Sequence, residues 1–234
     1  MSSVPKPTVL LFDIDGTLVT TGGAGRRAME RGFSSLYGSA AVLGFRFDGL
    51  TDRWIARRGL ESLGVEVTSE AIDAVLEAYV SALSEEVRRV PEDRYRVHAG
   101  VREAILHARK TGAAVGLGTG NVREGARLKL ERVALYAEFA FGGFGCDAEG
   151  REELIRIGAE RGARELGEPL EACRVVVIGD TPRDVAAARA NGAECIGVGT
   201  GAFSAAELSA SGATAAFDDL SQAGALGALL GGRV

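Results

Sequence analysis

The feature of this 234-residue chain that most limits its possible folds is a series of short, uninterrupted apolar runs separated by helical patterns. Runs of this kind predict strands that are buried on both faces, as in a parallel sheet. The expected strands are residues 9–12, 113–117, 175–178 and 195–198, with a weaker one at 139–141. Strands that alternate with helices predict right-handed βαβ units, and therefore a doubly wound α/β fold.

The helical patterns in the same part of the chain have recognisable ends. The expected helices cover residues 101–111, 122–135, 152–166 and 184–191. Gly112, Gly167 and Gly192 stand where the last turn of a helix commonly needs a left-handed residue. These glycines support the alternation of strand and helix after residue 100.

One connection is too long for this pattern. Roughly 80 residues separate the first strand from the helix at residue 101, far more than a simple crossover needs. The segment contains three amphipathic helical patterns of its own, at 24–37, 52–63 and 69–87. We therefore expect a helical cap domain of residues 21–95, inserted into an α/β core made of residues 1–20 and 96–234.

Composition limits the partners of the chain. A net charge of -5 and the lack of a basic run argue against a nucleic-acid partner. No apolar segment approaches the length of about 18 residues that a membrane helix needs. The three cysteines form no CxxC pair, and Cys173 and Cys195 are expected to be reduced and largely buried. We expect a cytoplasmic monomer or homodimer that binds neither nucleic acid nor membrane.

Acidic residues follow two of the expected strands. Asp13 and Asp15 come after the first, and Asp180 and Asp184 come after the third clear one. In open α/β sheets ligands bind beyond the carboxyl ends of the strands, so these side chains are expected to share one edge. Crowded carboxylates raise one another's pKa, and a hard divalent cation such as Mg²⁺ relieves that conflict.

The same edge has the parts that phosphoryl transfer needs. Asp13 can act as a nucleophile, and Asp15 can supply the proton transfers. Thr119, after the second strand, and the backbone N–H groups of Gly120 and Asn121 can hold phosphate oxygens. Each motif alone also fits ordinary turn or helix-cap chemistry. Three such motifs at the ends of three buried strands are better explained by a site.

These motifs carry a resemblance. DIDGTL at 13–18, Thr119 and GDTPRD at 179–184 resemble the haloacid dehalogenase superfamily, in its phosphoglycolate phosphatase-like branch. The resemblance covers essentially the whole chain, including the helical insertion. It implies that Asp13 is the nucleophile and Asp15 the general acid/base. It also implies that Asp13, the Asp15 backbone carbonyl and Asp180 bind Mg²⁺. From its place at the same edge of the sheet, Asp184 is expected to complete the metal site.

The third motif of that family is a lysine or arginine that neutralises the phosphorylated aspartate. No lysine follows Lys129 in this chain, and Arg151 stands where the cation is expected. An arginine stays charged and binds phosphate oxygens with two N–H groups, so it suits the role. Lys129, on the helix after Thr119, is the alternative.

The cap is expected to select the substrate. Residues 47–52 resemble the substrate-facing loop of such caps, and Thr51, Asp52, Arg53 and Arg26 are the candidate substrate-binding residues. The presence of Asp15 excludes the dehalogenases of the family. The absence of lysine from 20 to 95 excludes the branch that forms a Schiff base with a cap lysine.

The sequence thus predicts a Mg²⁺-dependent phosphomonoester hydrolase that acts on a small phosphorylated metabolite through an aspartyl-phosphate intermediate. Two alternatives stay open. One is a phosphomutase or phosphotransferase that uses the same intermediate, and the other is a catalytically silent binding protein of the same fold. The glycine-rich stretches 116–120 and 197–201 lack the G-x-G-x-x-G spacing of a dinucleotide site.

Overall fold

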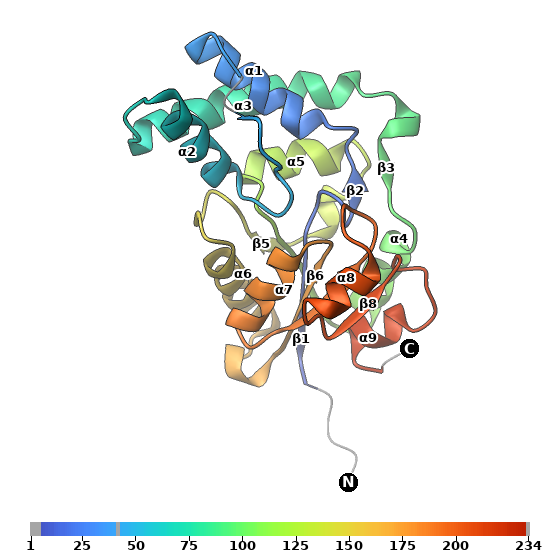
Figure 1. Ribbon diagram of the computed structural model, residues 1–234. Helices are drawn as coiled ribbons and strands as arrows, with labels where there is room; N and C mark the ends of the chain where they lie inside the picture. Colours follow the sequence, from blue (N-terminus) through green and yellow to red (C-terminus); the bar gives the residue numbers. More distant parts are fainter. Residues whose placement is uncertain (1–5, 41–42, 233–234) are drawn as a thin grey trace.

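The computed structural model describes residues 6–40 and 43–232. At its centre is a six-stranded sheet in the order β5-β4-β1-β6-β7-β8 (Figure 1). All of its strand pairs are parallel, which confirms the predicted doubly wound α/β fold. The strands are β1 (Thr8–Phe12), β4 (Ala114–Gly118), β5 (Phe141–Gly143), β6 (Arg174–Gly179), β7 (Glu194–Val198) and β8 (Ala215–Phe217).

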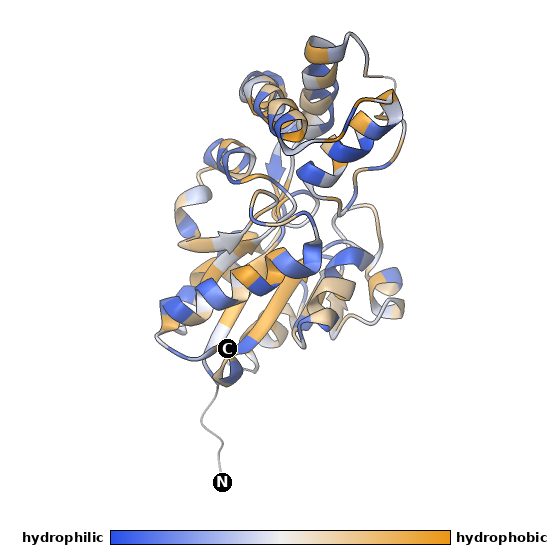
Figure 2. Ribbon diagram, turned by 90° about the vertical axis from the view of Figure 1, so that its left-hand side faces the viewer, coloured by the Kyte–Doolittle hydropathy of each residue, from blue (hydrophilic) through white to orange (hydrophobic). Residues whose placement is uncertain are grey.

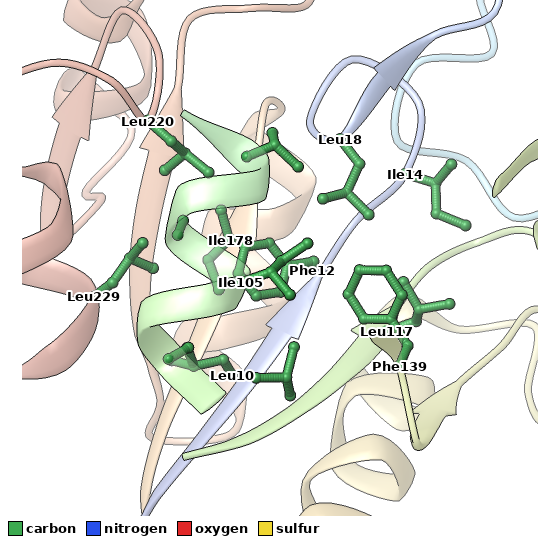
Figure 3. Close-up of a cluster of buried hydrophobic side chains, with 14 of the residues drawn as sticks. Leu10, Phe12, Ile14, Leu18, Ile105, Leu117, Phe139, Ile178, Leu220 and Leu229 are labelled. Atoms are coloured by element: carbon green, nitrogen blue, oxygen red, sulfur yellow. The ribbon is translucent and has the colours of Figure 1, made fainter. Parts of the chain in front are cut away.

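Helices cover both faces of this sheet. The helices of the core are α4 (Val101–Lys110), α5 (Arg123–Glu131), α6 (Arg151–Leu166), α7 (Pro182–Ala190), α8 (Ala205–Ala210) and α9 (Ala225–Leu230). Leu10 and Phe12 of β1 pack toward Ile105 of α4, as Figure 3 shows. Val9 and Leu11 point the other way, into a cluster with residues of α6 and α7. Figure 2 shows the hydrophobic strands between helices with hydrophilic outer surfaces.

Several helix and strand boundaries differ from those predicted from the sequence. Helix α5 ends at Glu131 instead of 135, and Ala134 adopts a positive φ of 53° in the turn that follows. Strand β5 begins at Phe141, where the sequence placed the end of a strand. Strand β8 and helices α8 and α9 were not predicted, because they are short and rich in alanine. The left-handed glycines are confirmed, with φ of 76° at Gly112, 70° at Gly167 and 63° at Gly192.

Three helices stand above the carboxyl edge of the sheet: α1 (Ala24–Tyr37), α2 (Asp52–Leu63) and α3 (Ser69–Arg89) (Figure 1). They share a core of their own, in which Met29 and Phe33 of α1 pack with Ile72 and Tyr79 of α3. The antiparallel strands β2 (Val19–Thr20) and β3 (Arg96–Val97) connect this layer to the sheet. We keep residues 21–95 as the proposed cap domain.

The remaining elements are single 3₁₀ turns at Glu92–Arg94, Tyr136–Glu138 and Leu170–Ala172. All three cysteines are free. Cys195 is buried as expected, whereas Cys173 is only partly buried and Cys146 is exposed. Among the described residues, no helix combines the length and the apolar character needed to cross a membrane.

Candidate active site

Asp13 is the first residue after β1. Its backbone N–H donates to Ile178 O at 2.9 Å, which extends the β1–β6 pairing and fixes the direction of the side chain. The residue is only 5% exposed, and Arg151 Nη2 lies 3.1 Å from its Oδ1. Burial raises the pKa of Asp13 to about 6, against the effect of Arg151 and with added repulsion from Asp184 and Asp15.

Asp180 and Asp184 reach the same place from the end of β6 and the start of α7. Carboxylate oxygens of Asp13, Asp180 and Asp184 lie within 4.8 Å of one another, and all three residues are buried. Burial raises the pKa of Asp180 well above its usual range, and the neighbouring Asp13 and Asp184 charges add to the rise. Buried, crowded oxygen donors of this kind fit Mg²⁺, because the ion prefers oxygen ligands and removes the repulsion.

The partners of Asp184 distinguish it from the other two. Its Oδ2 accepts from the N–H and the hydroxyl of Thr181, at 3.0 and 2.8 Å. Its Oδ1 accepts from Arg151 Nε at 2.8 Å and lies 2.5 Å from Arg151 Nη2. Both carboxylate oxygens are therefore engaged. Asp184 ties the start of α7 to Arg151, while Asp13 and Asp180 have oxygens with fewer protein donors.

Three neighbours of Asp180 had no role assigned from the sequence. The Thr17 hydroxyl donates to Asp180 Oδ1 at 2.9 Å. Gly16 and Gly201 enclose the other oxygen, because a Cβ at these positions would lie 2.3 and 1.8 Å from Asp180 Oδ2. Gly201 belongs to the glycine-rich stretch 197–201 at the carboxyl end of β7. This position at the end of a strand was the sequence signal that could have placed Gly201 near the site. Gly201 therefore lies directly against Asp180, a candidate metal ligand.

Asp15 has a different set of partners. Its Oδ2 accepts from Lys129 Nζ at 2.6 Å and from Asn121 Nδ2 at 2.9 Å, and its Oδ1 accepts from the Thr21 hydroxyl at 3.3 Å. Burial acts to raise the pKa of Asp15, but Lys129 and these hydrogen bonds outweigh it and hold the pKa below its usual value. The two candidate cations are thus separated, with Arg151 at Asp13 and Lys129 at Asp15.

The motif after β4 lies beside this pair. Thr119 is completely buried, and its hydroxyl accepts from Asn121 Nδ2 at 2.9 Å. Gly120 and Asn121 line the cavity, whereas Thr119 lies behind them. A Cβ at Gly120 would lie 2.5 Å from Leu50 O, so this glycine lets the cap loop approach the sheet edge.

The cavity between the sheet edge and the cap has a volume of about 250 Å³. Its floor includes Asp13, Asp15 and Asp180. The cap contributes apolar and polar residues to the opposite wall, among them Arg26, Met29, Phe47, Asp52, Ile55 and Tyr79. Pockets for drug-sized ligands hold roughly 300–1,000 Å³, so this one suits a smaller molecule.

The four cap residues that the sequence suggested as substrate-binding, Thr51, Asp52, Arg53 and Arg26, make different contacts. Asp52 lines the cavity; its Oδ2 accepts from Val122 N at 2.9 Å, and its own N–H donates to Gly120 O at 2.8 Å. Burial raises the pKa of Asp52 to about 6, although Lys129 opposes the rise. Thr51 donates to Glu149 O at 2.9 Å. Thr51 and Asp52 therefore dock the cap onto the core.

The two arginines of this set are held by other groups. The Arg26 guanidinium lines the cavity but donates to Leu43 O at 3.0 Å and Phe45 O at 2.6 Å. Arg53 pairs with Asp73 at 2.8 Å and lies outside the cavity lining. In this arrangement Arg53 forms an ion pair within the cap, and its role in substrate binding stays a prediction.

Comparisons with known proteins agree with the fold. The family model described as haloacid dehalogenase-like hydrolase matches residues 10–189, and a second one, HAD-hydrolase-like, matches residues 156–223. No curated protein matches the chain.

Solved structures with this fold are distant in sequence. CbbY from Rhodobacter sphaeroides in complex with phosphate has a TM-score of 0.70 and 20% identity, covering 93% of this chain and 96% of that one. A hydrolase from Pseudomonas syringae has a TM-score of 0.67 and 20% identity, with 91% and 94% covered. A predicted phosphoglycolate phosphatase from Haemophilus somnus has a TM-score of 0.67 and 15% identity, with 93% and 96% covered.

The match to the first family model spans most of the chain, from β1 to the end of α7. It includes the ends of β1, β4 and β6, where the buried acidic cluster and the Thr119 motif lie. The chain belongs to the haloacid dehalogenase-like hydrolases.

Proposed function

We propose that this protein is a Mg²⁺-dependent phosphatase that hydrolyses a phosphate monoester through a phosphorylated Asp13. The observation that carries the proposal is the buried cluster of Asp13, Asp180 and Asp184, whose oxygens lie within 4.8 Å of one another. Asp13 and Asp180 line the floor of a capped cavity, and Asp184 is buried next to them. A buried carboxylate beside a cation and other acids suits nucleophilic attack on phosphorus better than a purely structural role.

In the first step, Asp13 Oδ attacks phosphorus, the bond from phosphorus to the leaving oxygen breaks, and Asp15, which must enter this step in its protonated form, gives that oxygen its proton. In the second step, water attacks phosphorus, Asp15 takes the proton of the water, and the bond between Asp13 and phosphorus breaks. The products are the free alcohol, inorganic phosphate and regenerated Asp13. Arg151, 3.1 Å from Asp13, would neutralise charge on the phosphoryl group in both steps.

Asp13, Asp180 and the Asp15 backbone carbonyl are the groups proposed to hold Mg²⁺, with Asp184 acting through Arg151 and Thr181. The ion supplies positive charge to the phosphoryl oxygens and lets the acidic residues coexist as anions. The backbone N–H groups of Gly120 and Asn121 belong to residues that line the same cavity. We propose that they donate to phosphate oxygens and so orient the phosphate.

The substrate that this cavity fits is a small phosphorylated metabolite. A volume of about 250 Å³ leaves room for a phosphate and a short leaving group. The CbbY structures contain phosphate or xylulose-(1,5)bisphosphate, which shows that relatives of this fold accept such ligands. We propose a phosphoglycolate phosphatase-like activity in the cytoplasm, by a monomer or homodimer.

The test is release of inorganic phosphate from a panel of phosphorylated metabolites and p-nitrophenyl phosphate, with Mg²⁺ and after chelation. We expect turnover with Mg²⁺, loss on chelation and recovery when Mg²⁺ returns. Asp13→Asn should abolish turnover, whereas Asp93→Asn, at an exposed aspartate in the turn at Glu92–Arg94, should leave it unchanged. Full activity in Asp13→Asn, or after exhaustive chelation, would contradict the proposal.

A further inference from the structure

Lys129 is unusual among the three lysines of this chain. It lies in α5 and is only 3% exposed. A buried ammonium group loses its hydration, and it is tolerated only when the protein supplies paired charge and hydrogen-bond acceptors. The partners of this amine therefore indicate what it does.

The amine contacts the acid/base candidate and not the nucleophile. Its Nζ lies 2.6 Å from Asp15 Oδ2 and 2.6 Å from Asn121 Oδ1. Asn121 closes the triangle, because its Nδ2 donates to the same Asp15 Oδ2 at 2.9 Å. Two donors on one oxygen fix the orientation of the Asp15 carboxylate.

The cap completes the enclosure of this amine. A Cβ at Gly25, in the first turn of α1, would lie 3.2 Å from Lys129 Nζ and 4.0 Å from the Tyr79 hydroxyl oxygen. Lys129 is held from the other side as well, since its backbone carbonyl accepts from the Tyr95 hydroxyl at 2.8 Å. These contacts enclose the amine, so Lys129 is only 3% exposed although the Asp15 side chain that it pairs with is 42% exposed.

The nucleophile has its own cation. Arg151 Nη2 lies 3.1 Å from Asp13 Oδ1 and also holds Asp184, so the position of a third-motif residue is filled. Lys129 is then free for another task. The distances point to its direct partner, Asp15, as the group through which it acts.

We propose that Lys129 is a positioning residue that holds the Asp15 carboxylate in place for its two proton transfers, a role that rests on the proposed function. Lys129 keeps its own protons throughout. Lys129 does not neutralise charge on the phosphoryl group. Replacing it should slow only the steps in which Asp15 gives or takes a proton.

Substrates with different leaving groups can distinguish this positioning role from neutralisation of phosphorylated Asp13. A p-nitrophenolate anion departs without a proton, so forming the phosphorylated enzyme from p-nitrophenyl phosphate needs little from Asp15. An alkoxide departs only with a proton, so kcat/KM for an alkyl phosphate depends on Asp15. A residue that neutralised phosphorylated Asp13 would matter equally for both.

The experiment measures kcat/KM for p-nitrophenyl phosphate and for the best alkyl phosphate of the metabolite panel. For Lys129→Met we expect a loss of about 100-fold or more with the alkyl ester and of no more than about 3-fold with the aryl ester. Asp15→Asn should show the same selective loss. In the double variant the two losses should not multiply, because both act on one group.

Two further variants control for structure. Lys110→Met makes the same exchange at an exposed lysine at the end of α4 and should leave both activities unchanged. Lys129→Arg keeps the charge and should retain more alkyl-ester activity than Lys129→Met. It also provides the comparison should the methionine variant not fold, as judged by circular dichroism.

Equal losses with both esters, or multiplying losses in the double variant, would overturn the positioning role while leaving the phosphatase assignment intact. Unchanged alkyl-ester activity in folded Lys129→Met would overturn it too. A wild-type protein that is inactive on every ester, with Mg²⁺ present, would instead overturn the proposed function and this inference with it.

Discussion

Two buried cations serve two acidic residues that are only two positions apart in the sequence, and their surroundings differ. The side chains of the Arg151 cluster, consisting of Arg151, Asp13 and Asp184, are at most 7% exposed, and Arg151 also donates to Gly49 O of the cap loop at 3.3 Å. The Lys129 cluster, consisting of Lys129, Asp15 and Asn121, lies beneath the cap, and its Asp15 side chain is 42% exposed. The Arg151 cluster is therefore closed to water in this structure, whereas water reaches Asp15 in the Lys129 cluster.

This difference has an energetic consequence. An uncompensated charge is costly in a fully buried cluster, and much less costly where water reaches one partner. We expect the Arg151 cluster to matter to both folding and chemistry. The Lys129 cluster should matter mainly to chemistry.

The largest effect is expected at Arg151. Arg151→Met leaves Asp13 and Asp184 buried without their cation, which should cost about 3–5 kcal/mol of unfolding free energy. Lost charge stabilisation at phosphorus should also lower kcat by about 10²–10³-fold. Urea unfolding and steady-state kinetics test both, with Lys129→Met as the matched variant. A larger loss of stability in Lys129→Met would reverse the comparison.

An intermediate effect is expected at Asp52, where the cap meets the core. Burial raises its pKa from the usual 3.8 to about 6, so between these pH values the folded protein binds a proton that the unfolded chain has lost. Stability associated with Asp52 is therefore greatest at low pH and falls as pH rises through 6. Asp52→Asn cannot ionise and keeps an oxygen for Val122 N.

The measurement for Asp52 is urea unfolding of both proteins from pH 4 to 7 with chelator present. Relative to wild type, Asp52→Asn should gain up to about 3 kcal/mol as pH rises across this window. A constant difference between the two proteins would show that cap docking is not linked to ionisation of this group.

The smallest effect is expected at Arg53, which pairs with Asp73 on the cap. Arg53→Ala should cost no more than about 1 kcal/mol of stability, because partly exposed ion pairs contribute little. It should leave kcat/KM for every accepted substrate within about 2-fold. Arg26→Ala, which alters the cavity wall, should change the ranking of substrates. A strong change of ranking in Arg53→Ala alone would return Arg53 to the substrate site.

Much of the fold could be predicted because its signals are local. The apolar runs that form β1, β4, β6 and β7 are long enough to be recognised as strands in the sequence. Gly112, Gly167 and Gly192 mark helix ends because they adopt a positive φ, which other residues rarely do. The short β8 and α9 lack periodicity, and their position depends on packing against distant elements.

The candidate site, too, could be predicted in part. The sheet topology brings Asp13, Asp15 and Asp180 to one edge, and the order of strands along the chain is enough to expect that. The sequence left open which of Arg151 and Lys129 lies beside Asp13, because the direction of a side chain relative to a residue far away in the sequence cannot be read from sequence. Arg151 in particular could be taken for an exposed charge at a helix start, but it is buried.

We expect Asp13 to carry the phosphoryl group during turnover. Acid quenching of the wild-type enzyme with Mg²⁺ and its best substrate, followed by peptide mass spectrometry, tests this claim directly. We predict one phosphoryl group on the peptide that contains Asp13, formed at least as fast as phosphate is released and absent from Asp13→Asn. Turnover with no phosphorylated peptide in a rapid-quench series, together with an active Asp13→Asn variant, would contradict the account.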